Sequence, residues 1–284
     1  MEILWTFTHM LPVVAVDWGS RGIVTADNRG YVYIWSDTGP SLKLKFKADM
    51  SKISDVRISP SGRYIAVAGD RVIIYTFSGN EIYKFKNTSF TNKIIWFPDE
   101  KRLLAVQNKG VALITLFQDT AVESNTETGC PLLSGDISPD GEFFATGSCD
   151  GRVDIWSITI MKPYRILDRF QSEVRDIVWT KNGRLFVISD EGLKIYDTKT
   201  WKTLGEIKEN TFGSLFLAVS PLETGVIYGG TDKRVYYYDF KRNNLFESEP
   251  FFHWVVDGAW SENGLMFAAV SADNTGRVYM VKPH

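Results

Sequence analysis

Residues that could support catalysis or metal binding are few and widely separated in this chain of 284 residues. The histidines are His9, His253 and His284, and the cysteines are Cys130 and Cys149. A zinc site needs such ligands at short, regular spacings, and a helical HExxH pair is absent. A G-x4-G-K-[ST] loop, which would cradle phosphate, is also absent. The sequence therefore predicts no metal, no nucleotide and no other cofactor.

Aspartates are the remaining candidates for acid–base chemistry, which needs positioned carboxyl groups. Asp55, Asp176 and Asp257 recur along the chain, each three residues before a bulky apolar residue. An active site usually breaks the symmetry of a repeated scaffold, whereas a structural role repeats with it. The recurrence thus favours a structural role, and we predict that the protein is not an enzyme.

These residues are embedded in a pattern that repeats seven times. A bulky residue ends an apolar strand at steps of 40, 38, 41, 42, 40 and 41 residues, at Trp18, Ile58, Trp96, Ile137, Trp179, Val219 and Trp260. Tetrads such as VYIW at Val32 and VDIW at Val153 keep the same phase. A unit of about 40 residues is the length of one four-stranded propeller blade. We therefore predict an all-β fold, a seven-bladed propeller of four-stranded antiparallel blades.

The fourth repeat is the easiest to divide into strands, from its alternation and its turns. We expect an inner strand at 132–138, a second at 142–147, a third at 152–157 and an outer strand at 163–168. The last repeat lacks an outer strand, while residues 2–9 have strand character and no partner strands before them. We expect this N-terminal strand to complete blade 7, which removes an open sheet edge. Deleting residues 1–9 should then open the ring.

Composition is that of one folded domain over residues 1–284, with 44% hydrophobic residues and a net charge of −2. Pro/Gly/Ser-rich linkers do not divide the repeats. Two cysteines are too few for a disulfide scaffold and typical of a reducing compartment, although they could form one bridge. Glu2 stands where a signal peptide would be positive, and a run of ~18–20 apolar residues is absent. We expect a cytoplasmic protein without a membrane span.

Four stretches carry the pattern of a known repeat family. They are ISPDGEFFATGSCDGRVDIW at 137–156, VRDIVWTKNG at 174–183, DEGLKIYD at 190–197 and GGTDKRVYYYD at 229–239. These residues resemble the WD40 family, and the resemblance covers essentially the whole chain. It implies that the protein is a non-catalytic platform that assembles protein complexes through its connecting loops.

The same resemblance implies roles for individual residues. Asp150, Asp190 and Asp232 occupy the place of the family's hairpin aspartate, and we interpret them as structural turn residues rather than catalytic groups. In the family this aspartate joins a buried network with a histidine and a Ser/Thr. His9 alone stands at the histidine place, while Arg29 replaces the aspartate in the first repeat and Thr128 replaces the histidine in the fourth. The chain is therefore predicted to be a divergent member.

Positions that break the repeat are better guides to function. In a propeller, the residue six positions before each inner-strand anchor lies where the chain crosses to the next blade. These positions hold Pro12, Lys52, Phe90, Pro131, Glu173, Gly213 and Trp254. We predict that protein partners bind at Phe90, Trp254 and Lys52, supported by Phe252 and Glu173.

Trp254 ends an aromatic run at 251–254, and an exposed apolar cluster costs solubility unless a partner covers it. Two interpretations of this run remain open. The run could form part of a partner site. Alternatively, Phe251 and Phe252 pack under the loop and Trp254 fills the gap between blades 7 and 1.

Lysines alternate along two predicted outer strands. They are Lys43, Lys45 and Lys47 on one strand and Lys84 and Lys86 on its neighbour. Alternation places each set on one face, where it could contact nucleic acid. Lysine on an outer strand also discourages edge-to-edge aggregation, and the net charge of −2 favours this second interpretation.

Residues 117–129 are polar where blade 3 should have its outer strand, and we expect a loose strand with a long loop or a partner-specific insertion. Taken together, the sequence predicts a monomeric propeller that binds one or more proteins within a hetero-complex. The alternative is an accessory subunit of an RNA- or DNA-processing complex that contacts nucleic acid through the lysines.

Overall fold

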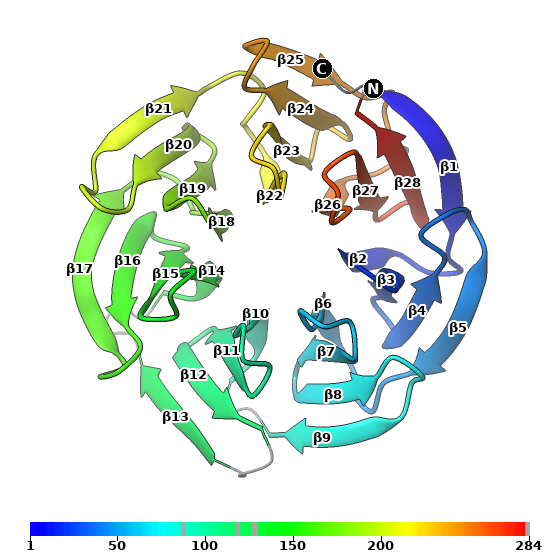
Figure 1. Ribbon diagram of the computed structural model, residues 1–284, viewed down its shortest axis with the longest axis horizontal. Coiled ribbons are helices and arrows are strands. Elements are labelled where there is room, and N and C mark those ends of the chain that lie inside the picture. The colour runs from blue at the N-terminus through cyan, green and yellow to red at the C-terminus, as the bar shows by residue number, and fades with distance from the viewer. Residues whose placement is uncertain (87–88, 117–119, 126–129, 282–284) are drawn as a thin grey trace. The chain divides into compact units, whose positions relative to one another are not determined.

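The computed structural model describes residues 1–86, 89–116, 120–125 and 130–281, with 120–125 described as backbone only. In these residues the strands form seven four-stranded antiparallel sheets (Figure 1). The predicted seven-bladed, all-β propeller is therefore confirmed. Each blade except the last takes its four strands from one consecutive stretch of the chain.

Blade 1 contains β2 (Val13–Gly19), β3 (Gly22–Asp27), β4 (Tyr31–Trp35) and β5 (Leu42–Lys47), and blade 2 contains β6 (Ile53–Ile58), β7 (Tyr64–Gly69), β8 (Val72–Thr76) and β9 (Glu81–Phe85). Blade 3 contains β10 (Thr91–Trp96), β11 (Arg102–Gln107), β12 (Gly110–Thr115) and β13 (Thr120–Asn125), and blade 4 contains β14 (Leu132–Ile137), β15 (Phe143–Ser148), β16 (Arg152–Ser157) and β17 (Lys162–Arg169). Blade 5 contains β18 (Asp176–Trp179), β19 (Arg184–Ser189), β20 (Gly192–Asp197) and β21 (Thr203–Ile207), and blade 6 contains β22 (Ser214–Val219), β23 (Gly225–Gly230), β24 (Val235–Asp239) and β25 (Asn244–Glu247). Blade 7 contains β26 (Val255–Trp260), β27 (Met266–Ser271) and β28 (Thr275–Met280), with β1 (Glu2–Thr8) as its outer strand.

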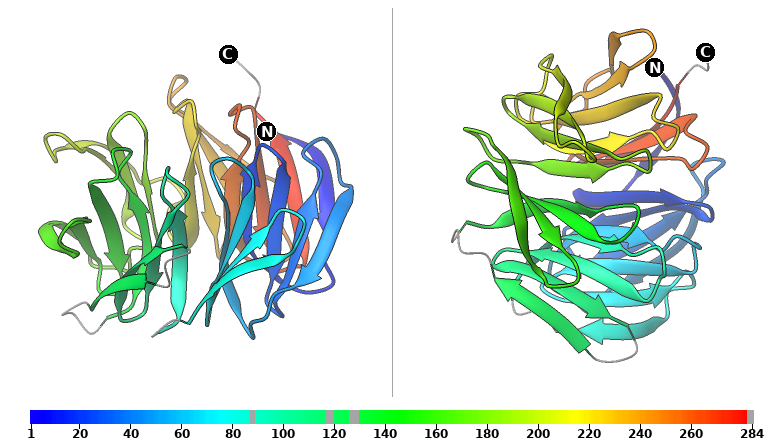
Figure 2. Two further views of the ribbon diagram at one scale, coloured as in Figure 1. Left: turned by 60° about the horizontal axis from the view of Figure 1, so that its bottom comes forward. Right: turned by 60° about the vertical axis from the view of Figure 1, so that its left-hand side comes forward.

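The N-terminal strand completes the last blade, as predicted. Strand β1 pairs antiparallel with β28 from Glu2↔Met280 to Thr8↔Thr275, with a bulge between Ile3 and Trp5. Figures 1 and 2 show the blue β1 lying along the red β28. The chain's first strand therefore covers the edge that β28 would otherwise expose.

Two compact units make up the chain. The first consists of residues 1–87 and 215–284, which contain blades 1, 2, 6 and 7, and the second consists of residues 88–214, which contain blades 3, 4 and 5. Within the first unit, buried clusters lie between blades 1 and 2, blades 7 and 1, and blades 6 and 7. Within the second, they lie between blades 3 and 4 and blades 4 and 5.

Burial across a blade explains why its strands differ in composition. Strand β3 is buried at all six positions, because neighbouring blades cover both of its faces. Outer strand β17 is mostly exposed and reads KPYRILDR. Glycines in the turns after the inner strands take the left-handed backbone that these turns require, with φ of 70° at Gly141 and 68° at Gly264.

The second unit also holds the chain's two cysteines. Cys130, just before β14, forms a disulfide with Cys149, just after β15. The sequence analysis allowed for one such bridge between the two cysteines. The cytoplasmic location stays a prediction. Strand β13 pairs with β12 over six residues, while residues 117–119 and 126–129 of the predicted loose segment lie outside the described residues. In the described part of the chain, no helix is long and apolar enough to cross a membrane.

Candidate functional site

The loop between β25 and β26 in the first unit carries the aromatic run singled out in the sequence. Phe251 is only 3% exposed and packs in the core between blades 6 and 7. Phe252 and Trp254 are 87% and 47% exposed. Phe251 therefore packs under the loop, as one interpretation of the sequence expected, but Phe252 does not. About half of Trp254 is open to solvent.

Hydrogen bonds to the β27–β28 turn hold this loop in place. The backbone N–H of Phe252 donates to Oδ2 of Asp273 at 2.8 Å, and the N–H of Ala272 donates to the carbonyl of Trp254 at 3.0 Å. The hydroxyl of Ser271 donates to the carbonyl of His253 at 3.1 Å. The two exposed rings are thus presented by a fixed backbone, which lowers the conformational cost of binding.

Arg277, on β28, secures the start of the loop. Its guanidinium lies 3.9 Å from the ring centroid of Phe251 and donates to the carbonyls of Glu249 at 2.9 Å and Pro250 at 3.0 Å. One cation therefore satisfies two carbonyls and stacks on the buried ring.

A third exposed apolar side chain, Met10, follows a residue that is bonded to the same β27–β28 turn. Met10 is 82% exposed and follows His9, whose backbone N–H donates to the carbonyl of Asn274 in the β27–β28 turn at 2.8 Å. We call Met10, Phe252 and Trp254 the loop patch. Phe252 and Trp254 hydrogen-bond to the β27–β28 turn themselves, and Met10 is the residue after His9, which also does so.

The other predicted partner residues lie elsewhere. Lys52 is exposed in the first unit, on the loop between β5 and β6. Phe90 and Glu173 lie in the second unit and are half-buried. The carbonyl of Phe90 accepts the N–H of Asn108 at 3.0 Å, and Glu173 forms an ion pair with Arg175 at 2.5 Å. Of the five predicted residues, the described contacts link only Phe252 and Trp254 through a common turn.

The lysines on β5 are engaged by residues of their own blade. Lys43 lies 3.8 Å from a carboxylate oxygen of Asp37 and donates to the carbonyl of Arg21 at 3.3 Å. Lys45 lies over the ring of Tyr31, with its Nζ 4.4 Å from the centroid, and Lys47 lies 5.3 Å from the same centroid. These cations are thus partly compensated within blade 1.

On the neighbouring outer strand, Lys84 forms an ion pair with Asp49, a carboxylate that also contacts Arg71 at 3.2 Å. These contacts with Lys84 lower the pKa of Asp49, which keeps the carboxylate charged opposite the lysine. Lys86 is exposed just beyond β9. The five lysines do not form a uniformly free basic stripe.

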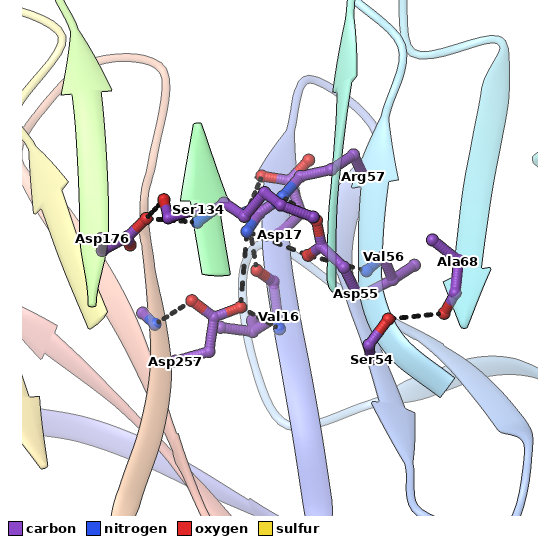
Figure 3. Close-up of polar contacts among 12 residues, drawn as sticks. Val16, Asp17, Ser54, Asp55, Val56, Arg57, Ala68, Ser134, Asp176 and Asp257 are labelled. Atoms are coloured by element: carbon purple, nitrogen blue, oxygen red, sulfur yellow. Dashed lines mark hydrogen bonds and ion pairs between the residues drawn. The ribbon is translucent and has the colours of Figure 1, made fainter. Parts of the chain in front are cut away.

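Inner-strand aspartates of the first unit surround Arg57 (Figure 3). Its Nη2 lies 3.0 Å from Oδ1 of Asp55 and 3.7 Å from Oδ2 of Asp257, and its Nη1 lies 3.9 Å from Oδ1 of Asp17. Burial raises the pKa of Asp17. Three carboxyl groups thus share one guanidinium, which offsets part of their charge.

The same carboxylates join neighbouring blades. Oδ2 of Asp17 on β2 accepts the N–H of Ile58 on β6 at 2.7 Å, and Oδ2 of Asp257 on β26 accepts the N–H of Val16 on β2 at 2.9 Å. Each such bond satisfies an inner-strand N–H that the blade's own sheet leaves without an acceptor. The geometry supports a structural role for these groups.

Lys93 and Asp176 form the corresponding ion pair in the second unit, at 2.8 Å. The hydroxyl of Ser134 donates to Oδ1 of Asp176 at 2.5 Å, as Figure 3 shows. Oδ2 of Asp136 on β14 accepts the N–H of Trp179 on β18 at 2.8 Å, and burial raises the pKa of Asp136 to about 6. Asp136 thus joins blade 4 to blade 5 as Asp17 joins blade 1 to blade 2.

His9 belongs to a buried chain of hydrogen bonds in the first unit. Its Nε2 lies 3.2 Å from the hydroxyl of Thr25, which accepts the indole N–H of Trp35 at 2.8 Å. Trp156 donates to Thr146 at the same distance in blade 4. The sequence interpretation missed these threonines, although each stands ten residues before its tryptophan. Burial lowers the pKa of His9 to about 4.

The three hairpin aspartates accept hydrogen bonds in different ways. Asp150 accepts the hydroxyl of Ser148, and Asp232 accepts the hydroxyl of Tyr236 at 2.6 Å. Asp190 accepts the N–H of Gly213 in the loop before β22 at 2.9 Å. Among the described residues, no group of three or more His, Cys, Asp or Glu side chains could hold a metal ion.

Comparisons with known proteins agree with the repeat pattern. The family model described as WD domain, G-beta repeat, matches residues 41–75 and 127–157. A periodic tryptophan protein 2 homolog from Dictyostelium discoideum is 25% identical over 276 residues, covering 84% of this chain. Actin-interacting protein 1 from Drosophila melanogaster is 22% identical over 64% of the chain, and human WD repeat and HMG-box DNA-binding protein 1 is 23% identical over 69%. The chain spans 29%, 31% and 18% of these relatives.

Proposed function

We propose that this divergent WD40-repeat propeller is a non-catalytic scaffold that binds a protein partner through the loop patch of its first unit. The single observation that carries the proposal is the pair of exposed aromatic side chains, Phe252 and Trp254, on a loop held by the β27–β28 turn. Aromatic residues dominate the energetics of protein interfaces, and exposed apolar groups on a fixed backbone favour association.

Similarity to other proteins supports the same class of function. The relatives include an actin-interacting protein, whose name records a protein partner, and a component of chromatin assembly factor 1 from Gallus gallus, whose name records membership of a complex. Neither name identifies the partner of this chain. Membership of a hetero-complex is therefore part of the proposal.

Nucleic-acid binding through the lysines receives less support from the geometry. Lys43 and Lys84 face carboxylates, and Lys45 lies over tyrosine rings. A phosphate would have to compete with these contacts, and the chain carries a net charge of −2. One relative is named as a DNA-binding protein, and the experiment below therefore also detects bound nucleic acid.

Affinity capture from native lysate at low and high salt tests the proposal, using wild type, a Phe252→Ala/Trp254→Ala double variant and Leu222→Ala. Leu222 is an exposed apolar residue in the same unit, outside the loop patch, and serves as the matched control. We expect wild type and Leu222→Ala to retain the same proteins at high salt, and the double variant to lose them. Retention by the double variant would contradict the proposal. Nucleic acid that is released by salt and by Lys45→Glu/Lys47→Glu would favour the alternative.

A further inference from the structure

We propose that a groove between blades 4 and 5 is a second docking site, for an acidic peptide segment that carries an aromatic side chain. The groove has a volume of about 640 Å³ and lies within the second unit, at the β14–β15, β18–β19 and β20–β21 turns. Ligand-binding clefts commonly measure ~300–1,000 Å³. The loop patch belongs to the other unit and shares no residue with this groove.

Two pairs of aromatic rings form the walls of the groove. Phe143 and Tyr164 of blade 4 lie with their ring centroids 5.4 Å apart. Trp179 and Trp201 of blade 5 pack edge to face at 5.9 Å. Tyr164 is 60% exposed, whereas Trp179 is nearly buried and Trp201 is half-buried. The groove thus combines aromatic rings with polar turn residues, and the Tyr164 ring is open to a ligand.

Trp201 occupies a turn position with a left-handed backbone. Its φ is 58°, in the left-handed region that bulky residues rarely adopt. The equivalent position of the matching turn in blade 6 is Asn243, with φ of 50°, a residue type that tolerates this conformation. In blade 4 the position is Met161, which is buried in the core. The left-handed backbone thus belongs to the turn and recurs in three blades, and Trp201 differs from the buried Met161 in being half-buried and lining the groove.

The charges that line the groove favour an anionic partner. Lys181 and Lys199 are exposed along it, and the guanidinium of Arg165 lies 5.4 Å from the Trp201 ring. The lining carboxylate, Asp140, is engaged by its own turn, accepting the Ser138 hydroxyl at 2.5 Å and the Glu142 N–H at 2.9 Å. Asp197 is likewise engaged, by the N–H of Thr200 at 2.6 Å. Among the lining residues, two lysines thus stand against one carboxylate, which leaves a net positive charge along the groove.

An acidic peptide fits these walls better than a single-stranded nucleic acid. Bases bind by stacking on open aromatic faces. Here Trp179 is nearly buried and the Trp201 ring already faces Arg165, so Tyr164 is the main open ring. One aromatic side chain beside Tyr164, flanked by carboxylates facing Lys181 and Lys199, matches what the groove offers.

Fluorescence anisotropy with the full chain and a labelled peptide, DEDFDED, tests the assignment. DEDADED lacks the aromatic group, KRKFKRK reverses the charge, and a labelled oligo-dT probes nucleic acid. Trp201→Asn places at this turn the residue type found at Asn243, which keeps the backbone compatible. Tyr164→Ala and Lys181→Glu/Lys199→Glu remove the open ring and the cations. Lys241→Glu is the matched control, because Lys241 occupies the position of Lys199 in the corresponding turn of blade 6.

We expect DEDFDED to bind wild type and to bind at least about tenfold more weakly to Trp201→Asn, Tyr164→Ala and the double lysine variant. Lys241→Glu should change its affinity by less than about twofold. The assignment is overturned if DEDFDED does not bind, if DEDADED or KRKFKRK binds equally well, if the three groove variants bind like wild type, or if oligo-dT binds more tightly. Such a result would leave the loop patch untouched, because the assay does not involve Phe252 or Trp254.

Discussion

Phe251 and Phe252 are neighbours in the chain with opposite surroundings. Phe251 packs in the core beneath Arg277, while Phe252 projects into solvent. Phe251→Ala should therefore reduce the free energy of unfolding by about 3–5 kcal/mol. Phe252→Ala should change it by no more than about 0.5 kcal/mol. Urea denaturation of the two variants measures both values, and equal losses would show that the exposed ring has a structural role.

His9 predicts a pH dependence with a defined sign. Its pKa is lowered to about 4 in the folded protein, against about 6.5 when unfolded. Between these values the unfolded chain binds the additional proton. The stability contributed by neutral His9 is therefore complete above about pH 6.5 and is lost as the pH falls towards about 4. Lowering the pH from about 7.5 to about 5 should remove about 2 kcal/mol through this residue.

Comparison with His9→Gln isolates this effect, because other groups titrate in the same window. The pKa of Asp136 is raised to about 6, so its contribution is lost as the pH rises, which is the opposite sign. Urea denaturation at both pH values should show a smaller loss on acidification for His9→Gln than for wild type. The same loss in both proteins would exclude His9 as the titrating group.

Residue environments explain which parts of the site could be predicted. The sequence places Phe251, Phe252 and Trp254 in one loop, but an irregular loop has no alternation from which to tell the buried ring from the exposed ones. Asp55 lies three residues before the anchor residue of its inner strand, as Asp176 and Asp257 do, and the repeat pattern therefore marks it. Asp17 lies one residue before its anchor and is outside that set. Both carboxylates meet at Arg57, a contact that only the fold brings about.

At the scale of the element, strand β1 is the feature whose loss should matter most. Removal of residues 1–9 leaves β28 without its outer partner and takes Phe7 from the core between blades 7 and 1. An unpaired edge next to an exposed core promotes aggregation. We expect the truncated chain to elute as aggregates in size-exclusion chromatography and to be rescued by a peptide of residues 2–9. A truncated chain that stays monomeric and equally stable would contradict this role for β1.

A glycine-to-alanine substitution in β28 tests the packing of Phe7 with the addition of only one methyl group. A Cβ added at Gly276 would lie 2.1 Å from Cε2 of Phe7, whereas one added at Gly205 in β21 would meet nothing within 4 Å. Gly276→Ala should therefore lower the free energy of unfolding by about 1–3 kcal/mol. Gly205→Ala is the matched control, and thermal denaturation of both variants is the measurement. Equal midpoints for the two variants would show that Phe7 moves aside freely.

Elements were the most predictable level of the fold. In blade 4 the third strand, Arg152–Ser157, agrees with its predicted range. The inner strand differs by one residue at its end, and the other two strands differ by one residue at both ends. Repetition explains this accuracy, because each strand lies at a nearly constant distance along the sequence from an anchor residue, and these anchors recur seven times. Side-chain partners across strands are not repeated: Asp37, Tyr31 and Asp49 engage the lysines from positions that no pattern in the sequence marks.

At the scale of the whole molecule, charge and apolar surface lead to different expectations for binding. Complexes held by phosphate contacts weaken steeply with salt, whereas those held by buried aromatic rings do not. Lys43 and Lys84 pair with carboxylates of blades 1 and 2, and the loop patch is apolar. We therefore predict a partner whose affinity depends on aromatic side chains and little on ionic strength.

The most direct test is the dissociation constant of the captured partner for wild type, Phe252→Ala/Trp254→Ala and Leu222→Ala, measured by calorimetry at low and high salt. We predict that the double variant binds at least about thirtyfold more weakly, the loss expected for an interface hot spot. Leu222→Ala should bind like wild type at both salt concentrations. Unchanged affinity of the double variant, or an affinity of wild type that collapses at high salt, would contradict the loop patch as the partner site.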